Sequence, residues 1–184
     1  DWSSDVCSSD LPGVGDSGGM NVYVRELVAA LAHAGVECTT YTREWRPGLP
    51  REIQVEPNHT VVHVPAGRPD LRKEELEAVL PSFTDFVLDD LRHRHPADVV
   101  HANYWLSGVA GHSIKHDVGI PLVSTFHTLA RVKAEGGDPE PERRERTEAS
   151  IIGCSDAICV SCDEEEDQFR RLYGNPPEIG RAHV

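Results

Sequence analysis

The stretch GVGDSGGMNVYVRELVAALAHAGVECTTYT, residues Gly13–Thr42, joins a glycine-rich loop to an amphipathic helix and a strand. The loop covers Gly13–Gly19. Apolar residues then recur at helical spacing over Met20–Ala34, and Gly35 supplies a C-terminal stop. The next segment, Glu37–Thr42, has the composition of a strand. This order of helix and strand is the repeating unit of α/β proteins.

The rest of the chain continues the alternation. Further strands are predicted at Thr60–Val64, Asp98–His101, Pro121–Thr125 and Ala157–Ser161. Helices are predicted at Lys73–Arg94 (restarted by Pro81), Ser107–His116, Glu140–Ser155 and Cys162–Tyr173, with loops at Trp45–Pro50 and Phe126–Lys133. The pattern predicts an α/β fold with a Rossmann-like, doubly wound parallel sheet. Ligands of such sheets bind beyond the carboxyl ends of the strands.

Bulk properties exclude several classes of function. The 184 residues suffice for one domain with a core, and no apolar run approaches the length that spans a bilayer. A formal charge of −13 argues against nucleic acid or an anionic membrane as partner. Five cysteines without dense pairing, and no visible signal peptide, predict a cytoplasmic location.

Three cysteines, Cys154, Cys159 and Cys162, lie close together and raise the question of a metal site. No fourth ligand has the paired spacing of a structural zinc site. Cys159 falls inside a predicted strand, where a small buried residue is the ordinary interpretation. The sequence therefore predicts no metal ion.

Polar residues follow two of the predicted strands. The segment His101–Trp105 (HANYW) follows one, and Phe126-His127-Thr128 follows the other, with Lys133 farther along. His127 is a candidate for hydrogen bonding to a ligand hydroxyl or for proton transfer, although a lone histidine is more often structural. Lys73, Lys133 and Arg144 are individually ordinary surface cations. Gly18 and Gly19 begin a helix, where the backbone can approach an anion, but a plain tight turn is equally consistent.

Taken together, GDSGGMNVYV (Gly15–Val24), HANYWLSG (His101–Gly108) and FHTLARVK (Phe126–Lys133) resemble segments of GT-B glycosyltransferases. The resemblance is strongest to the D-inositol-3-phosphate glycosyltransferases and the sucrose-phosphate synthases, and it covers residues 12–177. It implies the N-terminal, acceptor-side half of a GT-B fold. In that family a second Rossmann-like domain holds most of the nucleotide-sugar donor.

The resemblance also implies roles for particular residues. Gly19 and Asn21, with the neighbouring Gly18, would lie at the active-site cleft, and His127 would lie next to the transferred sugar. An acceptor phosphate would be bound by Lys73, Tyr104, Thr128 and Arg144, with Lys133 as a further cation. Arg143 and Arg146 are alternatives to Arg144, since the local register is open.

The reaction implied by the resemblance is transfer with retention of configuration, without a protein nucleophile or an obligatory metal. No cofactor is expected beyond a nucleotide sugar, such as a UDP- or GDP-sugar, as co-substrate. The partner would be a sugar or cyclitol phosphate, with a homodimer for the longer protein. Alternatives are an unphosphorylated sugar or lipid-linked acceptor, or a non-enzymatic flavodoxin-like binding module, which the residues at the strand ends disfavour.

The two ends of the chain are related through their coding sequence. EIGRAHV (Glu178–Val184) and DVCSSDL (Asp5–Leu11) can be encoded by reverse-complementary DNA that resembles a sequencing adapter. We therefore expect residues 1–11 and 178–184 to be foreign peptide without a regular place in the core, flanking a truncated acceptor-side domain over residues 12–177. The first strand and the donor domain would be missing, and the chain alone would be inactive.

Overall fold

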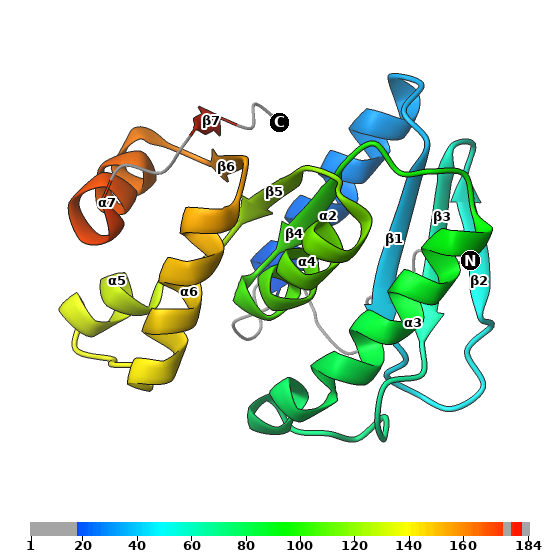
Figure 1. The fold of residues 1–184 in the computed structure, drawn as a ribbon, viewed down its shortest axis with the longest axis horizontal. Coiled ribbons are helices and arrows are strands. Elements are labelled where there is room, and N and C mark those ends of the chain that lie inside the picture. Colours follow the sequence, from blue (N-terminus) through cyan, green and yellow to red (C-terminus); the bar gives the residue numbers. More distant parts are fainter. Residues whose placement is uncertain (1–17, 175–177, 182–184) are drawn as a thin grey trace. The chain divides into compact units, whose positions relative to one another are not determined.

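The computed structural model describes residues 18–174 and 178–181 (Figure 1). The chain forms two compact units that divide between Leu71 and Arg72. Each is described by itself, as the N-terminal unit (described from residue 18 to residue 71) and the C-terminal unit (from residue 72 onward). The predicted foreign peptide at residues 1–11 lies outside the described residues.

The N-terminal unit is a helix on a small sheet. Helix α2 (Gly18–His33) contacts β1 (Cys38–Arg43) and β3 (His59–Val64). β1 and β3 are parallel, and β2 (Glu52–Glu56) pairs with β3 in the antiparallel direction. Gly35 ends the helix with a φ of 88°, as the sequence predicts.

The β2 strand corrects the prediction of a purely parallel sheet. Its sequence, EIQVE, alternates charged or polar residues with apolar ones, and its residues are exposed or half-buried. Such an alternation is typical of an antiparallel strand with one face exposed to solvent. The prediction was drawn from continuous apolar runs, which this strand lacks.

The C-terminal unit carries the second sheet. Its elements are η1 (Lys73–Val79), α3 (Leu80–His93), β4 (Val100–Asn103), α4 (Trp105–Val118), β5 (Leu122–Thr125), α5 (Ala130–Glu135), α6 (Glu142–Cys154), β6 (Ala157–Val160), α7 (Asp163–Tyr173) and β7 (Ile179–Arg181). The strand order is β4-β5-β6-β7, and all neighbouring pairs are parallel. Helix α4 packs on β4 and β5 and contacts both α3 and α6. Pro81 lies at the start of α3, which confirms the predicted helix restart.

Two expectations for this unit are wrong. The predicted loop Phe126–Lys133 contains the first part of α5. The C-terminal tail was expected to lie outside the core, but Ile179–Arg181 form β7, which pairs in parallel with β6. The apolar side chain of Ile179 packs against the hydrophobic core. A short segment with such a residue can add a strand to the sheet whatever the origin of the segment.

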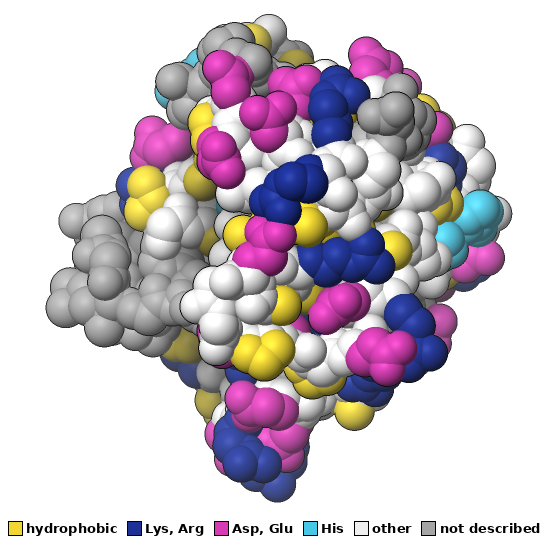
Figure 2. Space-filling model, turned by 90° about the vertical axis from the view of Figure 1, so that its left-hand side faces the viewer, with side chains coloured by type: hydrophobic (Ala, Val, Ile, Leu, Met, Phe, Trp, Pro, Cys, Tyr) yellow, Lys and Arg dark blue, Asp and Glu magenta, His cyan; other side chains and the backbone are white. Residues whose placement is uncertain are grey.

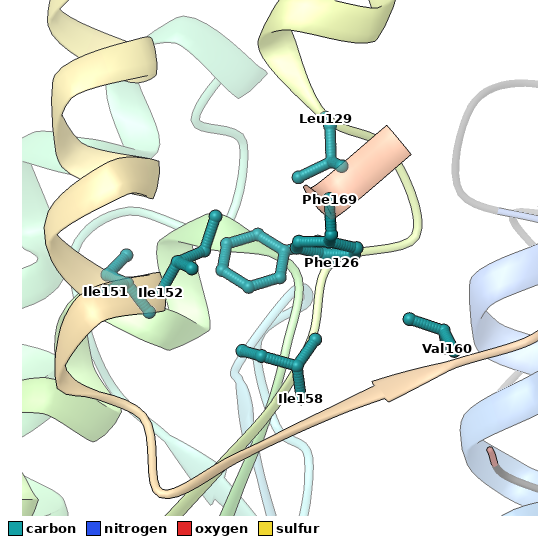
Figure 3. Close-up of a cluster of buried hydrophobic side chains, with 7 residues drawn as sticks. All are labelled: Phe126, Leu129, Ile151, Ile152, Ile158, Val160 and Phe169. Atoms are coloured by element: carbon teal, nitrogen blue, oxygen red, sulfur yellow. The ribbon is translucent and has the colours of Figure 1, made fainter. Parts of the chain in front are cut away.

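A cluster of buried apolar side chains anchors the loop that follows β5. Its members are Phe126, Leu129, Ile151, Ile152, Ile158, Val160 and Phe169 (Figure 3). The rings of Phe126 and Phe169 meet edge to face, with centroids 5.7 Å apart. Because Phe126 directly precedes His127, this packing fixes the backbone from which the polar residues of the loop project.

Charges of both signs share the surface. On the face seen in Figure 2, Lys and Arg side chains are interspersed with Asp and Glu side chains. On α7, for example, Arg170 pairs with Glu166 at 2.8 Å. In the part of the chain that the structure describes, no helix is both long enough and apolar enough to span a membrane.

The packing of α4 on the sheet depends on Gly111. A Cβ at this position would lie 2.8 Å from Cδ1 of Leu122 and 3.2 Å from Cβ of Ala102. We expect Gly111→Ala to lower the free energy of unfolding by about 1–3 kcal/mol through overpacking, despite the better helix propensity of alanine. Gly153→Ala in α6 is the matched control, because its Cβ meets no described atom within 4 Å. Urea denaturation of both variants checks the prediction, and equal stabilities would contradict it.

Candidate active site

Two strained residues mark the carboxyl edge of the second sheet. Tyr104 follows β4 with a φ of 77°, and His127 follows β5 with a φ of 61°. Positive φ is costly for residues of this size and persists where the surroundings impose it, often at functional sites. The amide of Tyr104 donates to the carbonyl of Thr125 at 2.7 Å, which ties the ends of β4 and β5 together.

The imidazole of His127 is held by the end of the neighbouring strand. Its Nε2 lies 2.9 Å from Oδ1 of Asn103. A carbonyl oxygen can only accept, so Nε2 carries the proton and donates. Burial, assisted by the nearby His101, lowers the pKa of His127 to about 4. His127 is therefore neutral at pH 7.

Arg144 is a buried cation at the first turn of α6. Its Nε donates to Oε1 of Glu148 at 2.8 Å, and its Nη1 lies 2.7 Å from Oε1 of Glu140. Its Nη2 donates to the hydroxyl of Thr128 at 3.2 Å. The guanidinium carbon also lies 5.3 Å from the ring centroid of Tyr104, within the range of a cation–π contact. The structure thus brings together Tyr104, Thr128 and Arg144, three residues that the resemblance assigned to one site.

Lys133 lies on α5 and is paired with two carboxylates. Its ammonium contacts Glu140 and lies 2.9 Å from Asp138. The hydrogen bonds that the ammonium donates to Glu140 and then to Asp138 raise the pKa of Lys133 above its usual value. Glu140 therefore bridges two cations, Lys133 and Arg144.

Glu148 joins the three helices around these residues. It is fully buried, and one of its oxygens accepts from the amide of Ala130 at 2.8 Å and from the hydroxyl of Tyr173 at 2.6 Å. Its other oxygen accepts from Arg144. Sequence analysis did not identify this role, since Glu148 lies among many charged residues, in a helix whose composition is typical of a solvent-exposed one.

A cavity of about 310 Å³ opens beyond β5 and β6. Its polar lining comprises His127, Thr128, Lys133, Ser161, Cys162, Glu164, Glu165 and Gln168. The carboxyl edge of a parallel sheet is where ligands of this fold class bind. The α7 residues in this lining were missed, because the acidic start of that helix was interpreted only as complementing the helix dipole.

The remaining predicted site residues are Lys73 in the C-terminal unit and three residues of the N-terminal unit. Lys73 is exposed at the first residue of η1, which is joined to α6 by an ion pair between Glu77 and Arg143. Gly18 and Gly19 open α2, and Asn21 is exposed on it. These three belong to the N-terminal unit, so their convergence with His127 stays a prediction.

Comparison with known proteins gives a consistent result. The family model described as "Glycosyl transferase 4-like domain" matches residues 18–183. The chain belongs to this glycosyltransferase family. A D-inositol 3-phosphate glycosyltransferase of Xylanimonas cellulosilytica is 44% identical over 182 residues, covering 95% of this chain and 43% of the relative. The corresponding protein of Acidothermus cellulolyticus is 41% identical over 176 residues, covering 92% of this chain and 39% of its own length.

The structural match agrees with the GT-B assignment. A sucrose-phosphate synthase from Thermosynechococcus elongatus matches with a TM-score of 0.82 and 28% identity, covering 89% of this chain and 42% of that one. The expected resemblance and fold class are confirmed, and the flavodoxin-like alternative is set aside. This glycosyltransferase domain spans about two fifths of the length of the curated relatives that it matches.

Proposed function

We propose that this chain is the acceptor-side domain of a retaining glycosyltransferase, which transfers a sugar from a nucleotide-sugar donor to a phosphorylated cyclitol or sugar. The observation that carries the proposal is the convergence of Tyr104, Thr128 and Arg144 beside His127, at the carboxyl edge of the sheet. The names of the relatives, D-inositol 3-phosphate glycosyltransferases, support a phosphorylated acceptor.

The acceptor phosphate would be bound where Glu140 now bridges Lys133 and Arg144. Two cations that share one carboxylate can exchange it for a phosphate oxygen, since charge-assisted hydrogen bonds form with either anion. The hydroxyl of Thr128 already faces Arg144 and can donate to the same phosphate. Lys73, at the start of η1, is proposed as the further cation.

His127 is proposed to position the sugar rather than to act as a general base. A group with a pKa near 4 is almost fully deprotonated at pH 7 and is a weak base there. The neutral ring, fixed by Asn103, can hydrogen bond without placing a positive charge beside an oxocarbenium-like transition state. Removal of the acceptor proton is then assigned to the departing donor phosphate, with no metal and no protein nucleophile.

The donor contacts are proposed to lie in the rest of the protein, because the relatives are more than twice as long as the matched region. Transfer needs both substrates aligned, so the 184-residue chain is expected to bind acceptor without turnover. A cytoplasmic location and a homodimer of the longer protein stay predictions.

An unphosphorylated acceptor is the second candidate, favoured by one observation. Lys133 and Arg144 are already neutralised by Asp138, Glu140 and Glu148. If these ion pairs persist when the acceptor binds, the two cations offer no unpaired positive charge to a phosphate.

Calorimetric titration with inositol 3-phosphate and with myo-inositol separates the two candidates. We expect the wild-type chain to prefer the phosphorylated ligand. Glu140→Gln removes the competing carboxylate and should tighten phosphate binding by roughly fivefold, the size of a partly exposed ion pair. It should leave myo-inositol binding unchanged.

Glu142→Gln is the matched control, because Glu142 lies two residues after Glu140, at the start of α6, and pairs with Arg146 on an exposed face of that helix. This control should bind both ligands like the wild type. Equal affinities of the wild type for the two ligands, together with no effect of Glu140→Gln, would reject the phosphorylated acceptor and favour the second candidate.

A further inference from the structure

A second cluster of polar side chains lies at the contact between α4 and the end of α6. His112 and His116 are one helical turn apart on α4, with ring centroids separated by 4.7 Å. The Sγ of Cys154, the last residue of α6, lies 3.2 Å from Nε2 of His116. One ligand atom from each of the three side chains lies within 4.8 Å of the others.

One atom of this cluster has no explanation within the described protein. The Nδ1 of His112 is buried and has no hydrogen-bond partner among the described residues. Buried polar atoms are almost always paired, so such an atom points to a missing ligand. A neutral imidazole is the form that binds metal ions.

We propose that His112, His116 and Cys154 form a binding site for a zinc-class divalent cation. Two imidazoles and a thiolate are the ligand types that Zn²⁺ selects, and three protein ligands leave a fourth position for water. Tetrahedral coordination at ordinary Zn–N and Zn–S lengths places ligand atoms about 3.4 Å apart. His116 and Cys154, at 3.2 Å, are already near that spacing, and all the ligand atoms lie within 4.8 Å of one another, a difference of at most about 1.4 Å that side-chain rotation can close.

The surroundings are compatible with a cation. Arg143 and Arg146 line a cavity together with His112, and each pairs with a carboxylate, of Glu77 and Glu142 respectively. The ammonium of Lys115 pairs with Asp156 at 2.7 Å. The same ammonium donates to the carbonyl of Cys154 at 2.7 Å, which holds the end of α6 against α4. His116 is exposed and gives an entry path for the ion. On binding, the thiol of Cys154 releases its proton to solvent, and the thiolate becomes the ligand.

This cluster differs from the one that the sequence suggested. Spacing drew attention to Cys154, Cys159 and Cys162 together and led to the prediction of no metal. In the described ranges, Cys154 groups with two histidines about 40 positions earlier in the chain, and neither of the other cysteines joins it. The site is also distinct from the cavity beyond β5 and β6.

Equilibrium dialysis of the whole 184-residue chain against ZnCl₂, after treatment with a chelator, tests the proposal. We expect one Zn²⁺ per chain. Co²⁺ should bind at the same site and give a thiolate-to-metal charge-transfer absorption. Cys154→Ser, His112→Gln and His116→Gln should each weaken Zn²⁺ binding by more than about tenfold, and Cys154→Ser should abolish the Co²⁺–thiolate band.

Matched controls keep the test decisive. Cys162→Ser removes an exposed cysteine outside the cluster, and His95→Gln removes an exposed histidine. Both should keep wild-type affinity and the thiolate band. Circular dichroism of each variant distinguishes lost binding from lost structure. Absence of bound Zn²⁺ in the folded wild type would overturn the proposal, as would a Co²⁺–thiolate band that survives in Cys154→Ser.

Discussion

Glu148→Ala is expected to lower the free energy of unfolding by about 3–5 kcal/mol, the cost of breaking a buried ion pair by removing one of its partners. The substitution strips Arg144 of a buried carboxylate 2.8 Å away. It also removes the acceptor of the Ala130 amide and of the Tyr173 hydroxyl. Against a total stability of about 5–15 kcal/mol, such a loss is large. Urea denaturation followed by circular dichroism measures it.

Two further variants separate the mechanism from a general loss of charge. Glu142→Ala removes an exposed carboxylate from the same helix and should change stability by less than about 0.5 kcal/mol. The double variant Arg144→Met, Glu148→Leu replaces the buried pair by apolar side chains. It should recover much of the loss, because the penalty comes from keeping a buried guanidinium after its buried carboxylate is removed. Similar destabilisation of the single and double variants would show that shape, rather than charge, governs this position.

The helices and parallel strands were predictable because each carries a local signal. The Pro81 restart and the Gly35 stop each follow from one residue's backbone preference. The elements that were missed have weaker signals. β2 has mixed polarity, and β7 has three residues and exists through its pairing with β6. Strand pairing is a tertiary property, and local sequence does not encode it.

The candidate site was predictable in part for a related reason. Tyr104, Thr128 and His127 follow strands, and the carboxyl ends of adjacent parallel strands meet at one edge. Arg144 was assigned only through the family resemblance. Its carboxylate partners could not be anticipated, because a charge buried in a network and a charge on a solvated helix look alike in sequence.

This network links stability to acceptor binding. Glu148 fixes Arg144 from the buried side, whereas Glu140 holds it from the half-buried side and is shared with Lys133. The first carboxylate therefore sets the position of the guanidinium, and the second is the one that a ligand can displace. Substitution of Glu148 should therefore lower the stability of the fold, whereas substitution of Glu140 should change the affinity for the acceptor.

Acidification should destabilise the chain through His127 before its carboxylates titrate. The folded-state pKa of about 4 lies below the unfolded value of about 6.5, so the unfolded chain binds more protons between these values. The contribution of neutral His127 to the free energy of unfolding is fully present above pH 6.5 and is lost as the pH falls toward 4. A shift of this size corresponds to at most about 3–4 kcal/mol, and partial exposure of the ring reduces it.

His127→Asn isolates this contribution, since asparagine tolerates a positive φ and its amide can still donate to Asn103. Burial also lowers the pKa of His59, His101 and His112. Part of the stability lost in acid is therefore common to the wild type and the variant. The free energy of unfolding, measured by urea titration from pH 7 to pH 4.5, should therefore fall more steeply for the wild type. His95→Asn, at an exposed position, should follow the wild type.

Parallel curves for wild type and His127→Asn would mean that His127 accepts a proton as readily in the folded chain as in the unfolded one. In that case its proposed role as a neutral positioning group would fail, and proton transfer would become the better assignment.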